Sequence, residues 1–237
     1  LFVIPFAYGQ VDSIVYNRLR SHVIVLASDN LMGRAAGSEH ERMANAYVTS
    51  QFLVNRRSKN QSWNFVVFKD STLNCQMVGS FISNKSPFTL LIGAHIDHIG
   101  LGGQLSKSIG KTGIHNGADD NAGGVAVLIE LQRYFAKKKL PFNLLLVAYT
   151  AHEIGTFGSE YLAGHFDKKY GTLAGVLNFD MIGRMDDKHR VYISCNAPAD
   201  SLFDTTDFVQ PVYQDQRKLE LLDTKHFLDR KIPCATF

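Results

Sequence analysis

The 237-residue sequence predicts an α/β fold, a three-layer α/β/α sandwich with a mixed, largely parallel central sheet. Strand-like and helix-like segments alternate along most of the chain, which is typical of a sheet covered by helices. Residues 90–92 and 144–147 are apolar at every position, as expected of central strands that are buried on both faces. Hydrophobic residues make up 45% of the chain, enough for one large core.

The first part of the chain, residues 11–58, is predicted to be mainly helical. Apolar residues recur at helical spacing up to Leu26, and a loop follows at residues 28–37. Ser38 and Glu41 have the spacing of a capping box, which predicts the start of a second helix. The apolar face of that helix is expected to contain Met43, Ala46, Tyr47, Leu53 and Val54.

The rest of the chain alternates between the two element types. Strands are predicted at residues 64–69, 76–82, 88–94, 143–150, 173–179 and 190–194. Helices are predicted at residues 122–138 and 159–166. No repeat or Pro/Gly-rich linker divides this region, so a single domain is expected.

Residues 1–9 have the pattern of the end of a signal peptide. An apolar run leads to Ala7 and Gly9, small residues with the spacing of a signal-peptidase site before Gln10. A buried N-terminal strand is the alternative. The pattern predicts a secreted or periplasmic protein whose catalytic domain is residues 10–237. No segment approaches ~18 consecutive apolar residues, so no membrane span is expected.

Charge and cysteine content narrow the function classes. The formal net charge is only +3, and the basic residues are scattered apart from short runs at 137–139 and 168–169, so no nucleic-acid partner is expected. Cys75, Cys195 and Cys234 allow at most one disulfide, and buried free thiols are equally compatible with their spacing.

Acids and histidines follow the predicted strands, where α/β sheets place their chemistry. Strand 88–94 leads into His95 and Asp97, an imidazole ligand with a carboxylate near enough to orient it. The segment 117–124 carries Asp119 and Asp120 between glycines. One residue of this segment can cap the following helix, but two adjacent carboxylates exceed what a cap requires.

Two further strand ends complete the pattern. His152 and Glu153 follow strand 143–150, and Asp180 follows strand 173–179. Three carboxylates in one crevice would repel one another unless cations were present. The candidate metal ligands are His95, Asp120, Glu153 and Asp180, a nitrogen and oxygen set that suits zinc in a hydrolytic site. Thr156 excludes the helical H-E-x-x-H motif of other metalloproteases.

These residues resemble the co-catalytic zinc aminopeptidases, typified by secreted bacterial leucine aminopeptidases and related in fold to glutamate carboxypeptidase and glutaminyl cyclase. The resemblance runs from about Leu31 to Phe237. It is carried by Gly-Arg at 33–34 with Gly-Ser at 37–38, Gly-Ala-His-Ile-Asp at 93–97, the segment 117–124, Glu153 with the glycines that follow, and Asn-Phe-Asp-Met-Ile-Gly at 178–183.

The resemblance implies a two-zinc aminopeptidase, a metallopeptidase that acts on the N-termini of peptides or proteins. His95 and Asp180 would hold one zinc, Asp120 would bridge two, and Glu153 would hold the second. Asp97 would be the carboxylate partner of His95. A bridging water would attack the N-terminal peptide bond, with carboxylates receiving the free amino group.

The chain departs from the family at two places. His152 stands where the family has its general-base Glu; an imidazole can also accept and return a proton, so His152 is the predicted base. The family's final zinc ligand is a His beyond the segment that matches Ile232 and Pro233, whereas this chain stops at Phe237. A domain truncated at its C-terminus is therefore expected, with one zinc if that ligand is absent and His226 as a candidate substitute.

Three alternatives stay open on these residues. The first is an aminoacyl transferase resembling glutaminyl cyclase, which cyclises an N-terminal Gln on the same fold. The second is a non-catalytic, zinc-containing relative that binds peptides. The third is a structural module without metal.

Overall fold

A computed structural model describes residues 12–69, 71–108, 112–184, 187–188, 190–196, 210–213 and 222–237. The predicted signal-peptide remnant, residues 1–9, lies outside the described residues. The strands are β1 (Ser58–Phe68), β2 (Thr72–Ile82), β3 (Phe88–His95), β4 (Asn143–Tyr149), β5 (Thr172–Asn178), β6 (Arg190–Cys195), β7 (Gln210–Tyr213) and β8 (Cys234–Thr236). The helices are α1 (Ser13–Leu26), α2 (Glu39–Gln51), α3 (Gly124–Phe135), α4 (Phe157–Gly164) and α5 (Lys225–Leu228).

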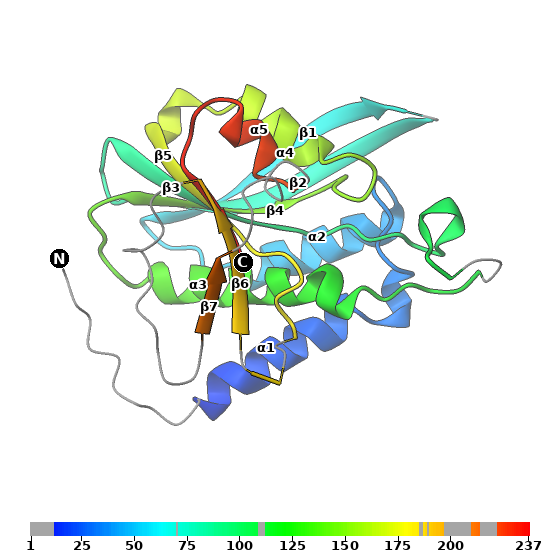
Figure 1. Ribbon diagram of the computed structural model, residues 1–237. Coiled ribbons are helices and arrows are strands. Elements are labelled where there is room, and N and C mark those ends of the chain that lie inside the picture. Colours follow the sequence, from blue (N-terminus) through cyan, green and yellow to red (C-terminus); the bar gives the residue numbers. More distant parts are fainter. Residues whose placement is uncertain are drawn as a thin grey trace.

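The described strands form one mixed sheet in the order β1-β2-β4-β3-β5-β8-β6-β7 (Figure 1). Strands β4, β3, β5 and β8 run parallel to one another at its centre. The long β1-β2 hairpin joins antiparallel to β4, while β6 runs antiparallel to β8 and parallel to β7. The predicted α/β class with a mixed sheet is confirmed, and the parallel centre places several strand ends at one edge.

Helices cover both faces of this sheet and create two cores (Figure 1). Ile92 and Leu146 belong to the core under α1, α2 and α3. Leu91 and Leu145, their neighbours along β3 and β4, belong to the opposite core with residues of α4 and α5. Because adjacent strand residues point to opposite faces, uninterrupted apolar runs were the signal for this three-layer arrangement.

Helix α2 differs from its prediction in extent and orientation. It ends at Gln51, since Phe52 has extended backbone angles, and β1 already begins at Ser58. Met43 of the predicted apolar face is exposed, whereas Glu41 and Asn45 are buried on the side that faces the core. The face prediction was wrong because it counted only apolar residues, and part of the buried face of α2 is polar.

The start of α2 confirms the predicted cap. The Ser38 hydroxyl accepts a hydrogen bond from the Glu41 amide at 3.1 Å. The Glu41 side chain accepts one in return from the amide of Gly37 at 2.7 Å, one residue earlier than in a standard capping box.

The three cysteines are buried thiols that are not joined by a disulfide, which resolves the choice that the sequence left open. Burial raises the pKa of Cys75 and of Cys234 to about 12, so both are protonated thiols at neutral pH. Among the described helices, none combines the length and the apolar character needed to cross a bilayer.

Candidate metal centre

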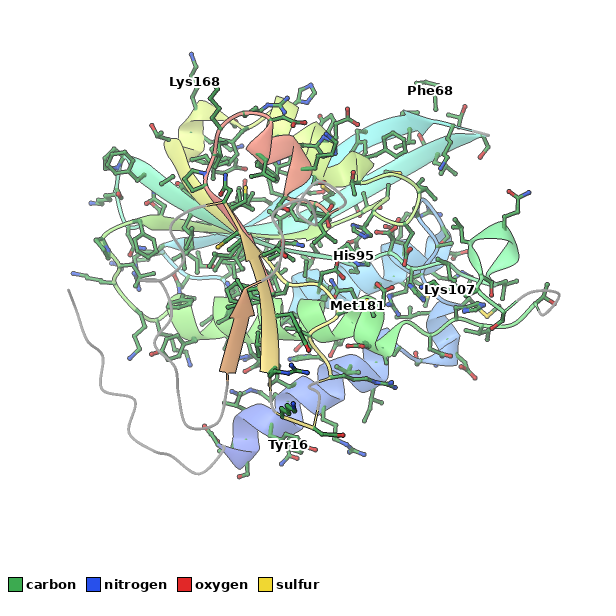
Figure 2. All side chains as sticks on the ribbon, in the orientation of Figure 1. Tyr16, Phe68, His95, Lys107, Lys168 and Met181 are labelled. Atoms are coloured by element: carbon green, nitrogen blue, oxygen red, sulfur yellow. The ribbon has the colours of Figure 1, made fainter. Side chains whose placement is uncertain are left out.

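The candidate site lies beyond the carboxyl ends of three adjacent parallel strands. His95 is the last residue of β3, His152 and Glu153 follow β4, and Asp180 follows β5. Because β4, β3 and β5 are neighbours in the sheet, their ends converge. His95 lies in the interior of the molecule, whereas Phe68 and Lys168 lie at its periphery (Figure 2).

His95 is fully buried and has one nitrogen without a hydrogen-bond partner. Its Nδ1 lies 3.0 Å from the backbone oxygen of Asp97, where it donates. Its Nε2 lies 3.2 Å from Asp120 Oδ1 and 3.4 Å from Asp180 Oδ1, yet makes no hydrogen bond. With the proton on Nδ1, a lone pair faces two carboxylates, an arrangement that a cation between them would stabilise.

The pKa values of His95 and Asp120 are shifted by the charges around them. Burial lowers the pKa of His95, but the carboxylates of Asp120 and Asp180 outweigh burial and raise the pKa well above its ordinary value. Burial raises the pKa of Asp120, but the nearby imidazole of His95 lowers this pKa by a larger amount, so the net shift is downward. These carboxylates therefore favour a positive charge at His95 Nε2, where a metal ion would take the place of the proton.

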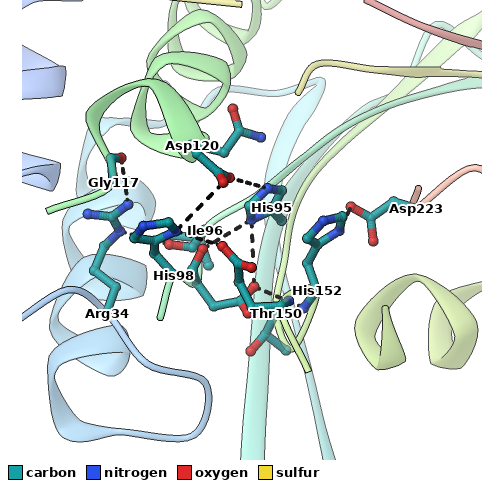
Figure 3. A network of polar contacts seen from close by, with 12 residues as sticks. Arg34, His95, Ile96, His98, Gly117, Asp120, Thr150, His152 and Asp223 are labelled. Atoms are coloured by element: carbon teal, nitrogen blue, oxygen red, sulfur yellow. Dashed lines mark hydrogen bonds and ion pairs between the residues drawn. The ribbon is translucent and has the colours of Figure 1, made fainter. Parts of the chain in front are cut away.

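Asp120 faces two imidazoles with its two oxygens (Figure 3). Oδ1 faces His95 Nε2, and Oδ2 lies 3.9 Å from His98 Nδ1. The same His98 nitrogen is 2.6 Å from Glu153 Oε1. Ligand atoms therefore gather in two groups, each within 4.8 Å: His95 with His152 and Asp180, and His98 with Asp120 and Glu153. The four predicted ligands share one site; their ligand roles stay a prediction.

Three polar residues of the segment between Gly117 and Gly124 make different contacts. Asn121 stabilises the start of α3, because its Oδ1 accepts the amide of Gly124, the first residue of that helix, at 3.1 Å while its Nδ2 donates to the Phe179 carbonyl. Asp119 accepts the Gly183 amide at 2.8 Å and fastens the loop that follows β5. Asp120 is left to face the site, in the irregular helical turn η3 (Ala118–Gly123).

Arg34 fixes the loops around the site. Its guanidinium is buried and donates to the carbonyls of Leu26, Ile96, Asn116 and Gly117. Figure 3 shows the contact with Gly117. Burial lowers the pKa of Arg34, and nearby carboxylates reverse part of this shift, which leaves the pKa at about 10. The guanidinium therefore remains charged at neutral pH. The loop after β3 and the loop before Asp120 are thereby fixed to one planar group.

Asp97 positions the segment that follows β4. Its two carboxylate oxygens accept the amides of His152 and Glu153, each at 3.1 Å. Its carboxylate lies 3.9 Å from His95 Nδ1. His95 is oriented instead by the hydrogen bond that Nδ1 donates to the Asp97 backbone oxygen. Burial raises the pKa of this fully buried carboxyl, although His95 and His152 oppose the rise.

His152 forms a hydrogen-bonded pair with Asp223, a partner that the sequence interpretation did not assign to it. Nδ1 lies 3.0 Å from Asp223 Oδ2, and the Asp223 side chain is only 1% exposed. Burial lowers the pKa of His152, but Asp223 outweighs it and the net shift is upward. The two residues lie 71 positions apart in the sequence, so no local pattern connects them.

The rings of His95 and His152 stack, with centroids 3.9 Å apart and an interplanar angle of 9°. The lone pair of an imidazole nitrogen lies in the plane of its ring. A single ion cannot lie in two parallel planes that are separated by a stacking distance. The stacked pair therefore favours His95 as a ligand and leaves His152 free for another role. His226, the suggested substitute ligand, lies 2.9 Å from the Thr156 hydroxyl and belongs to neither ligand group among the described residues.

Glu41 is a buried carboxyl beside the site. It is 1% exposed and accepts hydrogen bonds from the Gly37 amide and the Thr150 hydroxyl. Burial, reinforced by the nearby Asp97, raises its pKa to about 8 from an ordinary value of 4.5.

We expect Glu41→Gln to change how stability depends on pH. Between the two pKa values the folded protein binds the Glu41 proton and the unfolded chain does not, so stability falls as pH rises. The contribution is fully present below pH 4.5 and is lost as pH rises through about 8. Relative to Glu41→Gln, the wild type should lose up to roughly 1.4 kcal/mol per pH unit in this window.

The measurement is the melting temperature of both proteins from pH 4.5 to 9, under identical metal conditions. Other titrating groups are common to the two proteins and cancel in the difference. Parallel profiles for the wild type and Glu41→Gln would contradict the raised pKa.

Known proteins resemble this chain in sequence. The model of peptidase family M28 matches residues 77–237. Probable zinc metalloproteases of Pyrenophora tritici-repentis and Leptosphaeria maculans are 32% identical over 111 residues and 37% identical over 67 residues. The matches cover 44% and 28% of this chain, and they span only 24% and 16% of the length of those relatives.

Solved structures share the fold. The LapA aminopeptidase of Legionella pneumophila superposes with a TM-score of 0.67 at 18% identity, covering 100% of this chain and 68% of that one. The glutaminyl cyclase of Fimbriiglobus ruber gives a TM-score of 0.72 at 16% identity, covering 100% and 85%. At these identities the similarity establishes the α/β fold, which an aminopeptidase and a cyclase have in common.

Proposed function

Because this chain belongs to peptidase family M28, we propose that it is a zinc-dependent aminopeptidase that hydrolyses the N-terminal peptide bond of peptides. The observation that carries the proposal is the buried Nε2 of His95, which has no hydrogen bond and lies between the carboxylates of Asp120 and Asp180. A lone pair in that position is explained by a cation.

The residues that fit zinc are His95, Asp120, Glu153 and Asp180, with Asp120 between two ion positions. Zinc in such a site acts as a Lewis acid toward the scissile carbonyl and lowers the pKa of water. Imidazole and carboxylate are ordinary zinc ligands, and His95 already has its proton held on Nδ1 by the Asp97 carbonyl.

His152 is the proposed proton carrier. Asp223 holds the proton of Nδ1, which leaves Nε2 as the acceptor, and Nε2 lies 4.0 Å from Asp180 Oδ2 at the edge of the cluster. In this position Nε2 can take a proton from the attacking water and pass it to the leaving amine. Asp223 then stabilises the imidazolium, as the buried carboxylate does in other Asp-His pairs.

The open side of the site favours a substrate with a free amino group. The Asp120 and Glu153 side chains are 34% and 19% exposed, whereas His95 is completely enclosed. These carboxylates are the groups that an incoming N-terminus would meet. They attract the positive charge of a free α-amino group, which supports exopeptidase rather than endopeptidase activity.

Assays of the zinc-loaded protein on three substrates test the proposal. Leucyl anilide should be hydrolysed, while acetyl-leucyl anilide, which lacks the free amino group, should be hydrolysed at least about 100-fold more slowly. A peptide that begins with Gln should lose its first residue without ammonia release. Stoichiometric ammonia release from that peptide would favour a cyclase, and zinc-dependent binding without turnover would favour a non-catalytic relative.

A location outside the cytoplasm stays a prediction that rests on residues 1–9 alone.

A further inference from the structure

His98 is a second imidazole at the same carboxylate cluster, three residues beyond His95. Its Nδ1 lies 2.6 Å from Glu153 Oε1 and 3.9 Å from Asp120 Oδ2, and its side chain is only 12% exposed. One nitrogen of this ring is thus directed at two carboxylates that come from two other segments of the chain.

The surroundings keep the ring in this position. Gly117 has a positive φ of 58°, and a Cβ atom there would lie 2.7 Å from the His98 ring. The amide of His98 donates to the Arg34 carbonyl at 3.1 Å, while the Arg34 side chain binds the Gly117 carbonyl at 2.9 Å. The imidazole is therefore packed between two loops that Arg34 holds together. Because the ring is already held in place, it loses little conformational entropy when it binds an ion.

A hydrogen bond between His98 and Glu153 explains only one of the two contacts. It leaves unexplained why Asp120 directs Oδ2 toward His98 while Oδ1 faces His95. A carboxylate that faces one imidazole with each oxygen is placed as a bridge between two cation positions. The first position is bounded by His95 and Asp180, and the second by His98 and Glu153.

We propose that His98 is a ligand of the second zinc through Nδ1, completing a His98, Asp120 and Glu153 set. The inference rests on the proposed function and adds a residue that the sequence interpretation did not assign as a ligand. The end of β3 and the loop that follows it would then supply a ligand to each ion, with His95 using Nε2 and His98 using Nδ1. Three protein ligands leave positions open for water and substrate, as catalytic zinc requires.

Zinc binding by His98→Ala tests this inference, measured by equilibrium dialysis and elemental analysis. The wild type should bind two zinc ions per chain, and His98→Ala should bind one with unchanged affinity. The second ion should weaken by more than the ~10- to 100-fold that loss of a partner hydrogen-bonded to a ligand causes. His115→Ala is the matched control, since the His115 ring lies 6.4 Å from that of His98 and is in neither ligand group. It should retain both ions.

His98→Cys gives a spectroscopic test that misfolding cannot imitate. With cobalt in place of zinc, a thiolate ligand at position 98 should produce a thiolate-to-cobalt charge-transfer band in the near ultraviolet. Cobalt-loaded wild type and His115→Cys should lack that band. Its absence in a folded, cobalt-loaded His98→Cys protein, or two full zinc sites in His98→Ala, would overturn the assignment.

The outcomes separate this inference from the proposed function. If the wild type and both alanine variants each bind two ions and hydrolyse leucyl anilide, His98 is not a ligand but the aminopeptidase proposal stands. If the wild type binds no zinc, the proposed function fails first, and the assignment of His98 fails with it.

Discussion

Replacing His152 with alanine is expected to lower kcat on leucyl anilide by about 10²- to 10⁴-fold, the usual contribution of a general base. The bound zinc should not change, because the ring of His152 stacks on that of His95 and cannot share its ion. Steady-state kinetics together with zinc analysis of the same preparations measures both effects. Loss of one zinc ion in His152→Ala would show instead that His152 is a ligand.

Two further variants identify how His152 acts. Asp223→Asn keeps the shape of the side chain but can stabilise the wrong tautomer of His152, so kcat should fall while zinc content stays constant. His152→Glu restores the base of the related family and should retain measurable activity with a shifted acidic limb of the pH–rate profile. A His152→Glu enzyme far more active than the wild type would mark the natural site as degenerate.

Asp120→Ala is expected to have the largest effect, a loss of activity of more than about 10³-fold. Asp120 belongs to the ligand group of His98 and Glu153, and its Oδ1 also lies 3.2 Å from His95 Nε2 of the other group. Among the described residues, only Asp120 connects the two groups in this way. Its removal should weaken both ions, and a single lost electrostatic catalyst alone costs about 10²- to 10³-fold. Zinc content, measured after dialysis, should fall below one ion per chain.

The neighbouring carboxylate provides the control. Asp119 accepts one amide hydrogen bond, from Gly183, and does not face the cluster. Asp119→Ala should therefore keep both ions and cost only about 1 kcal/mol of stability. Equal loss of zinc in the two variants would mean that the segment acts through its fold and not through the Asp120 side chain.

The sequence predicted those features whose signals are local. Uninterrupted apolar runs gave β3 and β4, and the polar residues that follow each strand gave His95, Glu153 and Asp180. The parallel order of β4, β3 and β5 then brings these ends together, as the topology of such sheets requires. Residues 117–124 were likewise recognised, because two carboxylates between glycines exceed the needs of a helix cap.

The missed features depend on contacts between distant segments. His152 meets Asp223 across 71 residues, and His98 meets Glu153 across 55. Neither pair has a spacing that a helix or a strand would reveal. The buried face of α2 was misplaced for a related reason. The Glu41 carboxyl accepts hydrogen bonds from Thr150 and Gly37, and the Asn45 side-chain amide donates to the Gln76 carbonyl; these partners lie in other elements or before the helix.

Anomalous diffraction at the zinc absorption edge, from crystals of the zinc-loaded protein, locates the ions directly. Two peaks are predicted, one between His95, Asp120 and Asp180 and the other between His98, Asp120 and Glu153. Crystals grown with zinc that show no anomalous peak among these side chains would contradict a zinc enzyme built on this cluster.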